Sequence, residues 1–362
     1  MVRTILHEVA DLGQSAWLDA ISRDLIVSGG LARWAEQGIA GVTTNPSIFE
    51  KAIADTSDYD EQIIALADEG KGASEIYEAL TLQEVGAAAD ILSPLWERSK
   101  GVDGYVSLEV DPFLASDRDT TVSEAERLFA ALGRPNVMIK IPATAEGITA
   151  VEGCIAAGVN VNATLIFSQD QYAAVAEAYV KGLEARAAKG QDLSPASVAS
   201  VFVSRVDGAV DKALAAKGEA SLKGRIAVDN ARMTYQRFKE IFSGARWDAL
   251  ASKGARPQRP LWASTGTKDP AYSDVKYVQE LIGPDTVDTI PPQTLAAFLD
   301  HGKAIVTICD DIDGARARLA RIDELGIDLR AVCAKLIEDG LASFEGAFGS
   351  LIAAIEKKAS RR

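Results

Sequence analysis

Eight short apolar runs recur along the chain and constrain its fold more than any other feature. Each run is rich in β-branched residues and is bounded by Gly, Pro, Asn or Asp. Near-continuous apolar runs of this kind are typical of parallel strands that are buried on both faces of a sheet. The sequence therefore predicts eight strands, over residues 15–19, 41–46, 104–110, 136–142, 158–167, 197–205, 259–265 and 285–292.

Longer stretches with helical spacing of apolar residues separate these runs. Helices are predicted over 123–133, where Ser123 and Glu126 have the spacing of a capping box, and over 144–158 and 168–190. Strands that alternate with helices of crossover length favour an α/β fold of the (β/α)8 TIM-barrel type. A doubly wound open sheet is the alternative, but no GxGxxG follows the first run and no Walker A sequence occurs.

Two regions are longer than a simple barrel requires. Residues 47–103 exceed one crossover, and we expect two or three additional helices there. Residues 293–362 follow the last predicted strand and contain amphipathic patterns, which predict helices that pack on the outside of the barrel. Barrels of this class often exceed about 250 residues. We therefore expect one domain, a barrel with appended helices, over residues 1–362.

Charge and residue usage exclude several classes of function. The formal net charge of −14 argues against a nucleic-acid partner and means that an anionic substrate must meet a local cluster of cations. The only histidines are His7 and His301, so neither a His-rich metal site nor a Ser-His-Asp hydrolase is expected. Three cysteines without a CxxC pair, and no signal-peptide or membrane-spanning run, favour a reducing, cytoplasmic location away from membranes.

Polar side chains stand at or near the carboxyl ends of the predicted strands. In a barrel these ends meet at one mouth, where active sites are found. The sequence therefore predicts one site that brings together Asp19, Asn45, Glu109, Lys140, Asn162, Thr164, Ser200, Arg205, Ser264 and Lys268.

Lys140 is the most informative of these residues. It lies between Ile139 and Ile141 in a strand that we expect to be buried. Burial disfavours the ammonium form of a lysine, and a neutral amine is the form that attacks a ketone to make a Schiff base. The alternative is a lysine on an edge strand whose side chain extends to solvent.

Glu109 and Asp19 are candidates for general acid–base work, because each would lie beside an apolar strand and near a cation. Glu109 could instead be the ion-pair partner of Lys140, and Asp19 could cap the helix that starts near Ser22. Asn45, followed by Pro46, is by itself a turn signal.

Arg205 and Lys268 would together form a phosphate site. Barrels commonly bind phosphate near the loops that follow their last strands, and the guanidinium fork matches phosphate geometry. A surface salt bridge is the alternative for Arg205.

At this point the residues carry a resemblance to a known family. The segments GVTTNPSIFEKAI (41–53), VSLEVDP (106–112), IKIPAT (139–144), VNATLIFS (161–168) and LWASTGTKDPAY (261–272) resemble the transaldolase family. The similarity extends over roughly residues 15–295 and is greatest to the longer bacterial branch. It implies class I Schiff-base chemistry with no metal or organic cofactor, acting on phosphorylated sugars.

The resemblance also implies roles for single residues. Lys140 would form the Schiff base, and Asp19 would take the proton of the donor's C4 hydroxyl. Glu109, with a water held by Thr164, would move protons while the carbinolamine forms and breaks.

Substrate-binding roles follow from the same resemblance. Asn45, Asn162 and Ser200 would bind the dihydroxyacetone part, and Arg205 would bind the phosphate. Shorter transaldolases carry a second phosphate-binding arginine after strand seven. Here that stretch, which includes Ser264, offers Lys268 instead.

The implied reaction moves dihydroxyacetone from sedoheptulose 7-phosphate to glyceraldehyde 3-phosphate, giving erythrose 4-phosphate and fructose 6-phosphate in the pentose phosphate pathway. A fructose-6-phosphate aldolase is the nearest alternative. That related group carries a Tyr where this chain has Phe202, which cannot donate a hydrogen bond to water. A non-catalytic phosphosugar-binding barrel is a further alternative. For the assembly, a monomer or a homodimer is expected.

Overall fold

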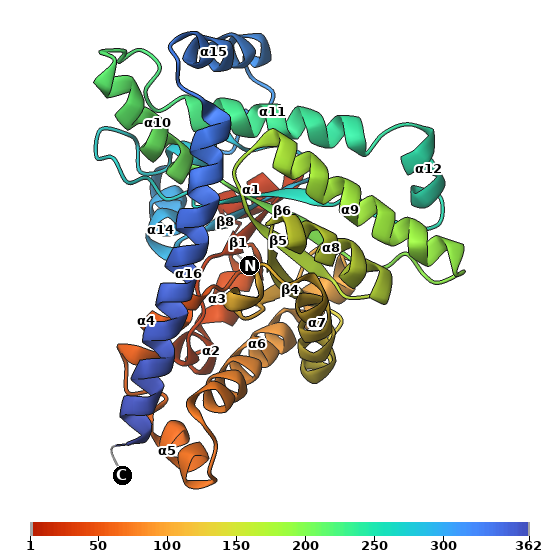
Figure 1. Ribbon diagram of the computed structural model, residues 1–362, viewed down its shortest axis with the longest axis vertical. Helices are drawn as coiled ribbons and strands as arrows, with labels where there is room; N and C mark the ends of the chain where they lie inside the picture. Colours follow the sequence, from red (N-terminus) through yellow and green to blue (C-terminus); the bar gives the residue numbers. More distant parts are fainter. Residues whose placement is uncertain (1–2, 361–362) are drawn as a thin grey trace.

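A closed barrel of eight parallel strands forms the centre of the computed structural model, which describes residues 3–360 (Figure 1). Consecutive strands pair around the ring, and β8 closes it by pairing with β1. The eight predicted strands and the TIM-barrel fold are therefore confirmed, and the doubly wound alternative is wrong. The strands are β1 Gln14–Leu18, β2 Ile39–Val42, β3 Tyr105–Glu109, β4 Val137–Pro142, β5 Val161–Ile166, β6 Ser197–Phe202, β7 Arg259–Ala263 and β8 Thr286–Ile290.

Helices surround the barrel as the sequence predicts, with one boundary that differs. Helix α8 (Ala145–Ala157) begins after Thr144 and ends before Gly158, whose φ of 98° suits glycine. Helix α7 (Arg118–Leu132) begins five residues before the predicted capping box at Ser123. Asp117 caps it instead, accepting from the Thr120 backbone N–H at 3.1 Å. An aspartate cap starts the helix earlier, so Ser123 lies inside it.

The remaining crossover elements complete the outer ring. They are α1 Ile5–Asp11, α2 Arg23–Val27, α3 Gly30–Glu36, the 3-10 helix η1 Pro112–Leu114, α9 Gln169–Ala188, α10 Ser204–Ala216, α11 Ile226–Ile241, α12 Ala245–Ala251, α13 Lys276–Glu280 and α14 Pro292–His301. None of the helices within residues 3–360 has the length and apolar character needed to cross a bilayer.

Large side chains pack on both faces of the barrel wall. Trp17 on β1 and Trp262 on β7 are fully buried. Gly41 on β2 makes room for the first of them, because a Cβ there would lie 2.5 Å from the Trp17 ring. The packed interior leaves the carboxyl ends of the strands as the place where a ligand can enter.

The insertion after β2 contains three helices, in agreement with the expected two or three. They are α4 Pro46–Ala54, α5 Asp60–Asp68 and α6 Ala73–Arg98. Helix α4 starts directly at the carboxyl end of β2, so the insertion begins at the mouth of the barrel.

The C-terminal helices differ from the prediction in where they pack. Helix α15 (Ile312–Glu324) contacts α11 on the outside, as expected. Helix α16 (Leu329–Ala359) instead runs past α10, α4 and α5 and contacts β5 and η1 (Figure 1). The amphipathic pattern predicted a helix with an apolar face, but that face lies partly over the mouth.

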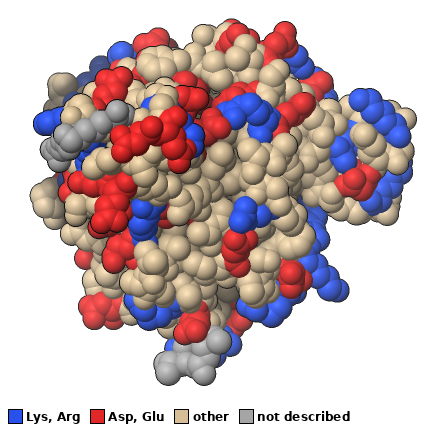
Figure 2. All heavy atoms as spheres, turned by 90° about the horizontal axis from the view of Figure 1, so that it is seen from below, with Lys and Arg blue, Asp and Glu red and all other residues tan. Residues whose placement is uncertain are grey.

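Charged side chains are mixed over the face drawn in Figure 2. Acidic groups gather over part of this face, and basic side chains lie singly or in small groups among them. This distribution agrees with the formal charge of −14.

Candidate active site

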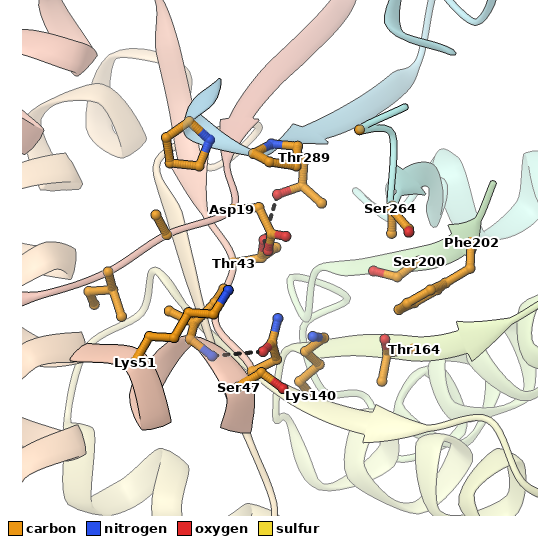
Figure 3. A pocket seen from close by; sticks show the side chains of 18 of the residues that line it. Asp19, Thr43, Ser47, Lys51, Lys140, Thr164, Ser200, Phe202, Ser264 and Thr289 are labelled. Carbon is orange, nitrogen blue, oxygen red and sulfur yellow. Dashed lines mark hydrogen bonds between the residues drawn. The ribbon is translucent and has the colours of Figure 1, made fainter. Parts of the chain in front are cut away.

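A cavity of about 640 Å³ opens at the carboxyl ends of the strands (Figure 3). It is lined by side chains that come from most of the strand ends, as expected for a barrel mouth. Of the predicted site residues, those that line this cavity are Asp19, Asn45, Lys140, Thr164, Ser200, Phe202, Arg205, Ser264 and Lys268.

Two predicted residues lie behind the wall of this cavity. Asn162 is fully buried on β5, where its Oδ1 accepts from Ser200 Oγ at 2.7 Å and its Nδ2 donates to Ser107 Oγ at 3.0 Å. The Asn162 amide therefore fixes the Ser200 hydroxyl. Glu109 on β3 contacts Lys140 from the neighbouring strand.

Lys140 is held in the barrel interior with 4% exposure. Strand register sets Glu109 of β3 and Asn162 of β5 on its two sides. Its Nζ donates to the Thr44 carbonyl at 2.9 Å and lies 3.1 Å from Glu109 Oε1. The alternative of a lysine that reaches solvent from an edge strand is therefore wrong, because β4 has neighbours on both sides and the closed barrel has no edge.

The Glu109 carboxyl is poised to exchange protons near neutral pH. Burial raises the pKa of Glu109 to about 7, although the positive charge of Lys140 opposes the rise. Apart from the ion pair of Oε1 with Lys140, the Glu109 oxygens are buried without a hydrogen-bonding partner among residues 3–360, and so is Thr164 Oγ1. Such atoms require a partner, and a water between them would satisfy both.

Asp19 faces the cavity and does not cap a helix. Ser22 caps α2, accepting from the Leu25 backbone N–H at 3.2 Å, so the alternative role of Asp19 as that cap is wrong. Thr43 Oγ1 donates to Asp19 Oδ1 at 2.7 Å, and the two side chains lie together in Figure 3. Burial raises the pKa of Asp19, while the charge of Lys140 and the Thr43 hydrogen bond oppose the rise. A carboxylate with a raised pKa is a better base.

Asn45 both caps helix α4 and lines the cavity. Its Oδ1 caps α4 by accepting from the Ile48 backbone N–H at 3.0 Å, which explains the turn signal with Pro46. The same residue lines the cavity. The cap fixes the side chain, so its amide nitrogen can be presented to a ligand in one orientation.

Cations stand at the outer part of the cavity. Arg205 lies in the first turn of α10, directly after β6, and is half-buried. No carboxylate within the described residues pairs with it, so a surface salt bridge is not its role. Burial lowers the pKa of the Arg205 guanidinium. Lys268 is exposed in the loop after β7, and Ser264 precedes it with a φ of 57° and its Oγ 2.9 Å from Ser204 Oγ.

Sequence reasoning missed several residues of the cavity wall, among them Lys51 and Phe344. Lys51 of α4 extends into the cavity in Figure 3, and Phe344 of α16 places its ring 5.7 Å from Lys140 Nζ. Lys51 belongs to the quoted segment 41–53 and follows Asn45 on the same helix, which is the signal that could have identified it. No local pattern marks Phe344, because its position depends on how α16 packs.

Asp288 on β8 is a further buried carboxyl that the sequence reasoning missed. It is fully buried, and Oδ1 accepts from Thr265 Oγ1 at 2.8 Å. Burial raises the pKa of Asp288 to about 8, and the nearby charge of Asp19 adds to the rise. Asp288 therefore holds a proton at neutral pH, which keeps a second negative charge away from Asp19.

We expect the Asp288→Asn variant to be more stable than the unaltered protein at alkaline pH. Between the ordinary carboxyl pKa of 3.8 and the folded pKa of about 8, the folded state binds a proton that the unfolded state has released. The contribution of Asp288 to the free energy of unfolding therefore falls as pH rises through that window. The asparagine variant has no proton to release and does not show this fall. Thermal unfolding at several pH values measures this. A melting-temperature difference that stays constant with pH would contradict it.

No cluster of three or more His, Cys, Asp or Glu side chains that could hold a metal ion occurs within residues 3–360. The ionisable groups near the foot of the cavity are the buried pair of Lys140 and Glu109 and the half-buried Asp19, with cations further out. This arrangement can support attack of an amine on a carbonyl, proton transfer, and binding of an anion.

Comparisons with known proteins find similarity to one family along almost the whole chain. A family model described as transaldolase/fructose-6-phosphate aldolase matches residues 16–355. A transaldolase of Thiobacillus denitrificans is 49% identical over 356 residues, which cover 97% of this chain and 99% of the relative. A transaldolase of Trichodesmium erythraeum is 45% identical, and the match covers 100% of this chain and 99% of the relative. Transaldolase 1 of Streptomyces avermitilis is 48% identical, with 97% and 94% covered.

Proposed function

The chain belongs to the transaldolase/fructose-6-phosphate aldolase family, and from this premise we propose that it is a transaldolase that works through a Schiff base on Lys140. It transfers a dihydroxyacetone unit from sedoheptulose 7-phosphate to glyceraldehyde 3-phosphate, a reaction of the pentose phosphate pathway. The products are erythrose 4-phosphate and fructose 6-phosphate. The observation that carries the proposal is the buried Lys140–Glu109 pair, 3.1 Å apart, at the foot of a cavity that Asp19 also lines.

Schiff-base formation uses Lys140, Glu109 and Thr164. The neutral Nζ attacks C2 of the ketose, and the carbinolamine then loses its C2 hydroxyl as water to give an iminium. Glu109 passes the required protons through a water held by Thr164. The support is that Glu109 Oε2 and Thr164 Oγ1 are buried without a hydrogen-bonding partner among the described residues, and that the pKa of Glu109 is raised to about 7.

Cleavage of the C3–C4 bond follows from the charge on the iminium. Asp19 takes the proton of the C4 hydroxyl, the C3–C4 electrons move to the iminium, and an aldehyde leaves. The three-carbon enamine remains on Lys140 until the acceptor arrives. The raised pKa of Asp19 supports this role, because it makes the carboxylate a stronger base.

Binding groups hold the two ends of the sugar. Asn45 and Ser200 bind the dihydroxyacetone hydroxyls, and Asn162, which lies behind the wall, supports this binding by orienting Ser200. Arg205 binds the phosphate and Lys268 assists, with Ser264 on the same wall. The unpaired, half-buried state of Arg205 supports an anion as its partner.

Phe202 favours transfer over release of free dihydroxyacetone. Its ring lines the cavity and packs against Phe167 with the centroids 5.3 Å apart. This ring cannot donate a hydrogen bond to a water. It therefore does not assist the protonation of the enamine and the hydrolysis of the resulting iminium, which together would release free dihydroxyacetone. The same observation disfavours the aldolase alternative, and the joint presence of Lys140, Glu109 and Asp19 disfavours a non-catalytic barrel.

The test is a transfer assay with sedoheptulose 7-phosphate and glyceraldehyde 3-phosphate, combined with borohydride reduction in the presence of fructose 6-phosphate. Mass spectrometry of the reduced protein should show one dihydroxyacetone- or ketose-sized adduct, located on Lys140. Release of free dihydroxyacetone at the rate of ketose consumption would indicate an aldolase instead.

Activity is expected to survive exhaustive chelation, because the iminium supplies the electron sink that a metal supplies in other aldolases. The measurement is the transfer rate after incubation with EDTA and removal of the chelator. A large loss that a divalent cation restores would contradict this expectation.

The proposal also covers the partners of the protein, its location in the cell and its assembly. Phosphorylated sugars are its small-molecule partners, with no nucleic acid or membrane involved. Cys154, Cys309 and Cys333 are unpaired, which supports a reducing, cytoplasmic location. We further propose that residues 1–362 act as one domain, as a monomer or a homodimer.

A further inference from the structure

The two cations assigned to the substrate phosphate come from different segments of the chain. Arg205 lies in the first turn of α10, whereas Lys268 lies in residues 264–275, the loop between β7 and α13. Both side chains line the mouth cavity. One phosphate can contact both cations only if this loop keeps a fixed position against α10. The contacts that hold the loop therefore decide whether the two cations act together.

Two tyrosines tie the β7–α13 loop and the start of α13 to α10. Tyr272 Oη donates to Asp211 Oδ2 at 2.6 Å, and Tyr277 Oη donates to Asp207 Oδ2 at 2.9 Å. Asp207 and Asp211 are four residues apart on α10, so they lie on one face of that helix. We call these four residues the tyrosine clamp. It begins two residues after Arg205 in the sequence.

The two carboxylates of the tyrosine clamp are each held at their other oxygen as well. Asp211 Oδ1 accepts from the Gly224 backbone N–H at 2.9 Å, and Asp207 Oδ1 accepts from the Ala227 backbone N–H at 2.8 Å. Both aspartates are buried. Each therefore offers its tyrosine a fixed acceptor, and neither needs the Arg205 guanidinium as a partner.

The Tyr272 ring lies directly against the backbone that follows α10. Gly224 has a φ of 68°, and a Cβ there would lie 2.7 Å from the Tyr272 Cζ. Glycine at this position therefore lets the ring approach Asp211. Burial, the hydrogen bond to Asp211 and the charges of nearby aspartates raise the pKa of Tyr272. The phenol thus keeps its proton and remains a donor at neutral pH.

A second cavity, of about 740 Å³, lies beside the clamp. Its lining includes Arg205, Lys268 and all four residues of the tyrosine clamp. Side chains that border a cavity have fewer packing neighbours, so hydrogen bonds carry a larger share of the loop's position. Loss of one of these hydrogen bonds should therefore loosen the loop without unfolding the barrel.

We propose that Tyr272 is a positioning residue for the substrate phosphate, because its hydrogen bond to Asp211 holds the β7–α13 loop where Lys268 and Arg205 can contact one phosphate. Tyr272 is not among the described residues that line the mouth cavity, so it acts through Lys268. This inference rests on the proposed function and adds to it a residue that sets the preference for phosphorylated sugars.

The first test compares acceptors with and without a phosphate. In Tyr272→Phe, the KM for glyceraldehyde 3-phosphate should rise about three- to tenfold, the range for loss of one hydrogen bond, while kcat changes by less than about twofold. The kcat/KM for glyceraldehyde should stay unchanged. Phenylalanine keeps the ring against Gly224, so the variant should fold, and thermal unfolding checks this. An equal loss with both acceptors would mean that Tyr272 only supports the fold, and would overturn the proposal.

A double-mutant cycle tests whether Tyr272 acts through Lys268. Tyr272→Phe, Lys268→Ala and the double variant are compared by their kcat/KM for glyceraldehyde 3-phosphate. The double variant should lose no more than Lys268→Ala alone, because the hydrogen bond has no lysine left to position. Losses that multiply in the double variant would contradict the positioning role.

Tyr235 on α11 provides the matched control. Its Oη donates to the Pro284 carbonyl at 3.1 Å, just before β8 and therefore at the opposite end of the barrel. Tyr235→Phe loses a comparable hydrogen bond and should keep the unaltered preference between the two acceptors. An equal change of preference in Tyr235→Phe and Tyr272→Phe would count against a specific role of Tyr272.

Binding of inorganic phosphate, measured by calorimetry, gives a result that does not depend on turnover. The Kd should rise about threefold or more in Tyr272→Phe and Lys268→Ala, and should not change in Tyr235→Phe. An unchanged Kd in Tyr272→Phe, or no phosphate binding by the unaltered protein, would overturn the proposal. If this binding pattern is found but the unaltered protein transfers no dihydroxyacetone, the proposed function is wrong and the positioning role of Tyr272 stands.

Discussion

Replacing Lys140 with Ala should abolish covalent trapping by borohydride and lower the transfer rate by about three decades or more, because the covalent route is lost. Lys140 Nζ contacts the buried carboxyl of Glu109 at the foot of the mouth cavity. Mass spectrometry after reduction with fructose 6-phosphate gives the trapping result, and a coupled assay gives the rate.

The Lys140→Ala variant should still fold near or below neutral pH. The positive charge of Lys140 lowers the pKa of Glu109, and the variant lacks this charge. The pKa of this carboxyl, already about 7, would therefore rise, and the group would be neutral in the variant. Circular dichroism serves as the check on folding. Lys51→Ala provides the comparison, since it removes another lysine of the same cavity and should still give one adduct. A reduced adduct on the Lys140→Ala protein would show that the Schiff-base assignment is wrong.

Arg205→Ala should weaken kcat/KM for phosphorylated sugars by about one to two decades. A charge-assisted hydrogen bond to phosphate is worth about 1.5–3 kcal/mol, and about 1.4 kcal/mol corresponds to a factor of ten. The loss should be much smaller with glyceraldehyde, an acceptor that has no phosphate. Steady-state kinetics with the two acceptors, glyceraldehyde 3-phosphate and glyceraldehyde, measures the difference.

Lys268→Ala should show the same preference with a smaller loss. Lys268 is exposed, whereas Arg205 is half-buried, and a solvated charge contributes less to binding. An equal loss with both acceptors in Arg205→Ala would mean that this residue supports the fold or the chemistry, and its assignment to phosphate would have to be abandoned.

The strands and Lys140 could be predicted because their signals are local. A parallel strand buried on both faces appears in the sequence as a short apolar run, and a lysine within such a run is conspicuous. The order of strands around the barrel then brings Lys140 beside Glu109 without further information. Asp19 needed the structure to decide between base and helix cap, because both roles place an aspartate after a strand.

Features that depend on packing between distant segments could not be predicted. The pattern of α16 shows that it has an apolar face, but it does not show that this face meets α4 and brings Phe344 over the cavity. The low exposure of Asp288 depends on neighbours from β1 and β7.

The closure of the barrel and the position of α16 also set the order in which the site can be completed during synthesis. Gln14 of β1 bonds to Thr286 near the start of β8, a separation of 272 residues, and Lys358 of α16 pairs with Asp60 across 298. Contacts this distant in sequence form slowly, since much chain must be ordered before they contribute. A nascent chain therefore carries Lys140 and Glu109 in an unclosed sheet well before Phe344 covers them. The cavity that receives the sugar is therefore completed after the residues that carry out the chemistry have been synthesised.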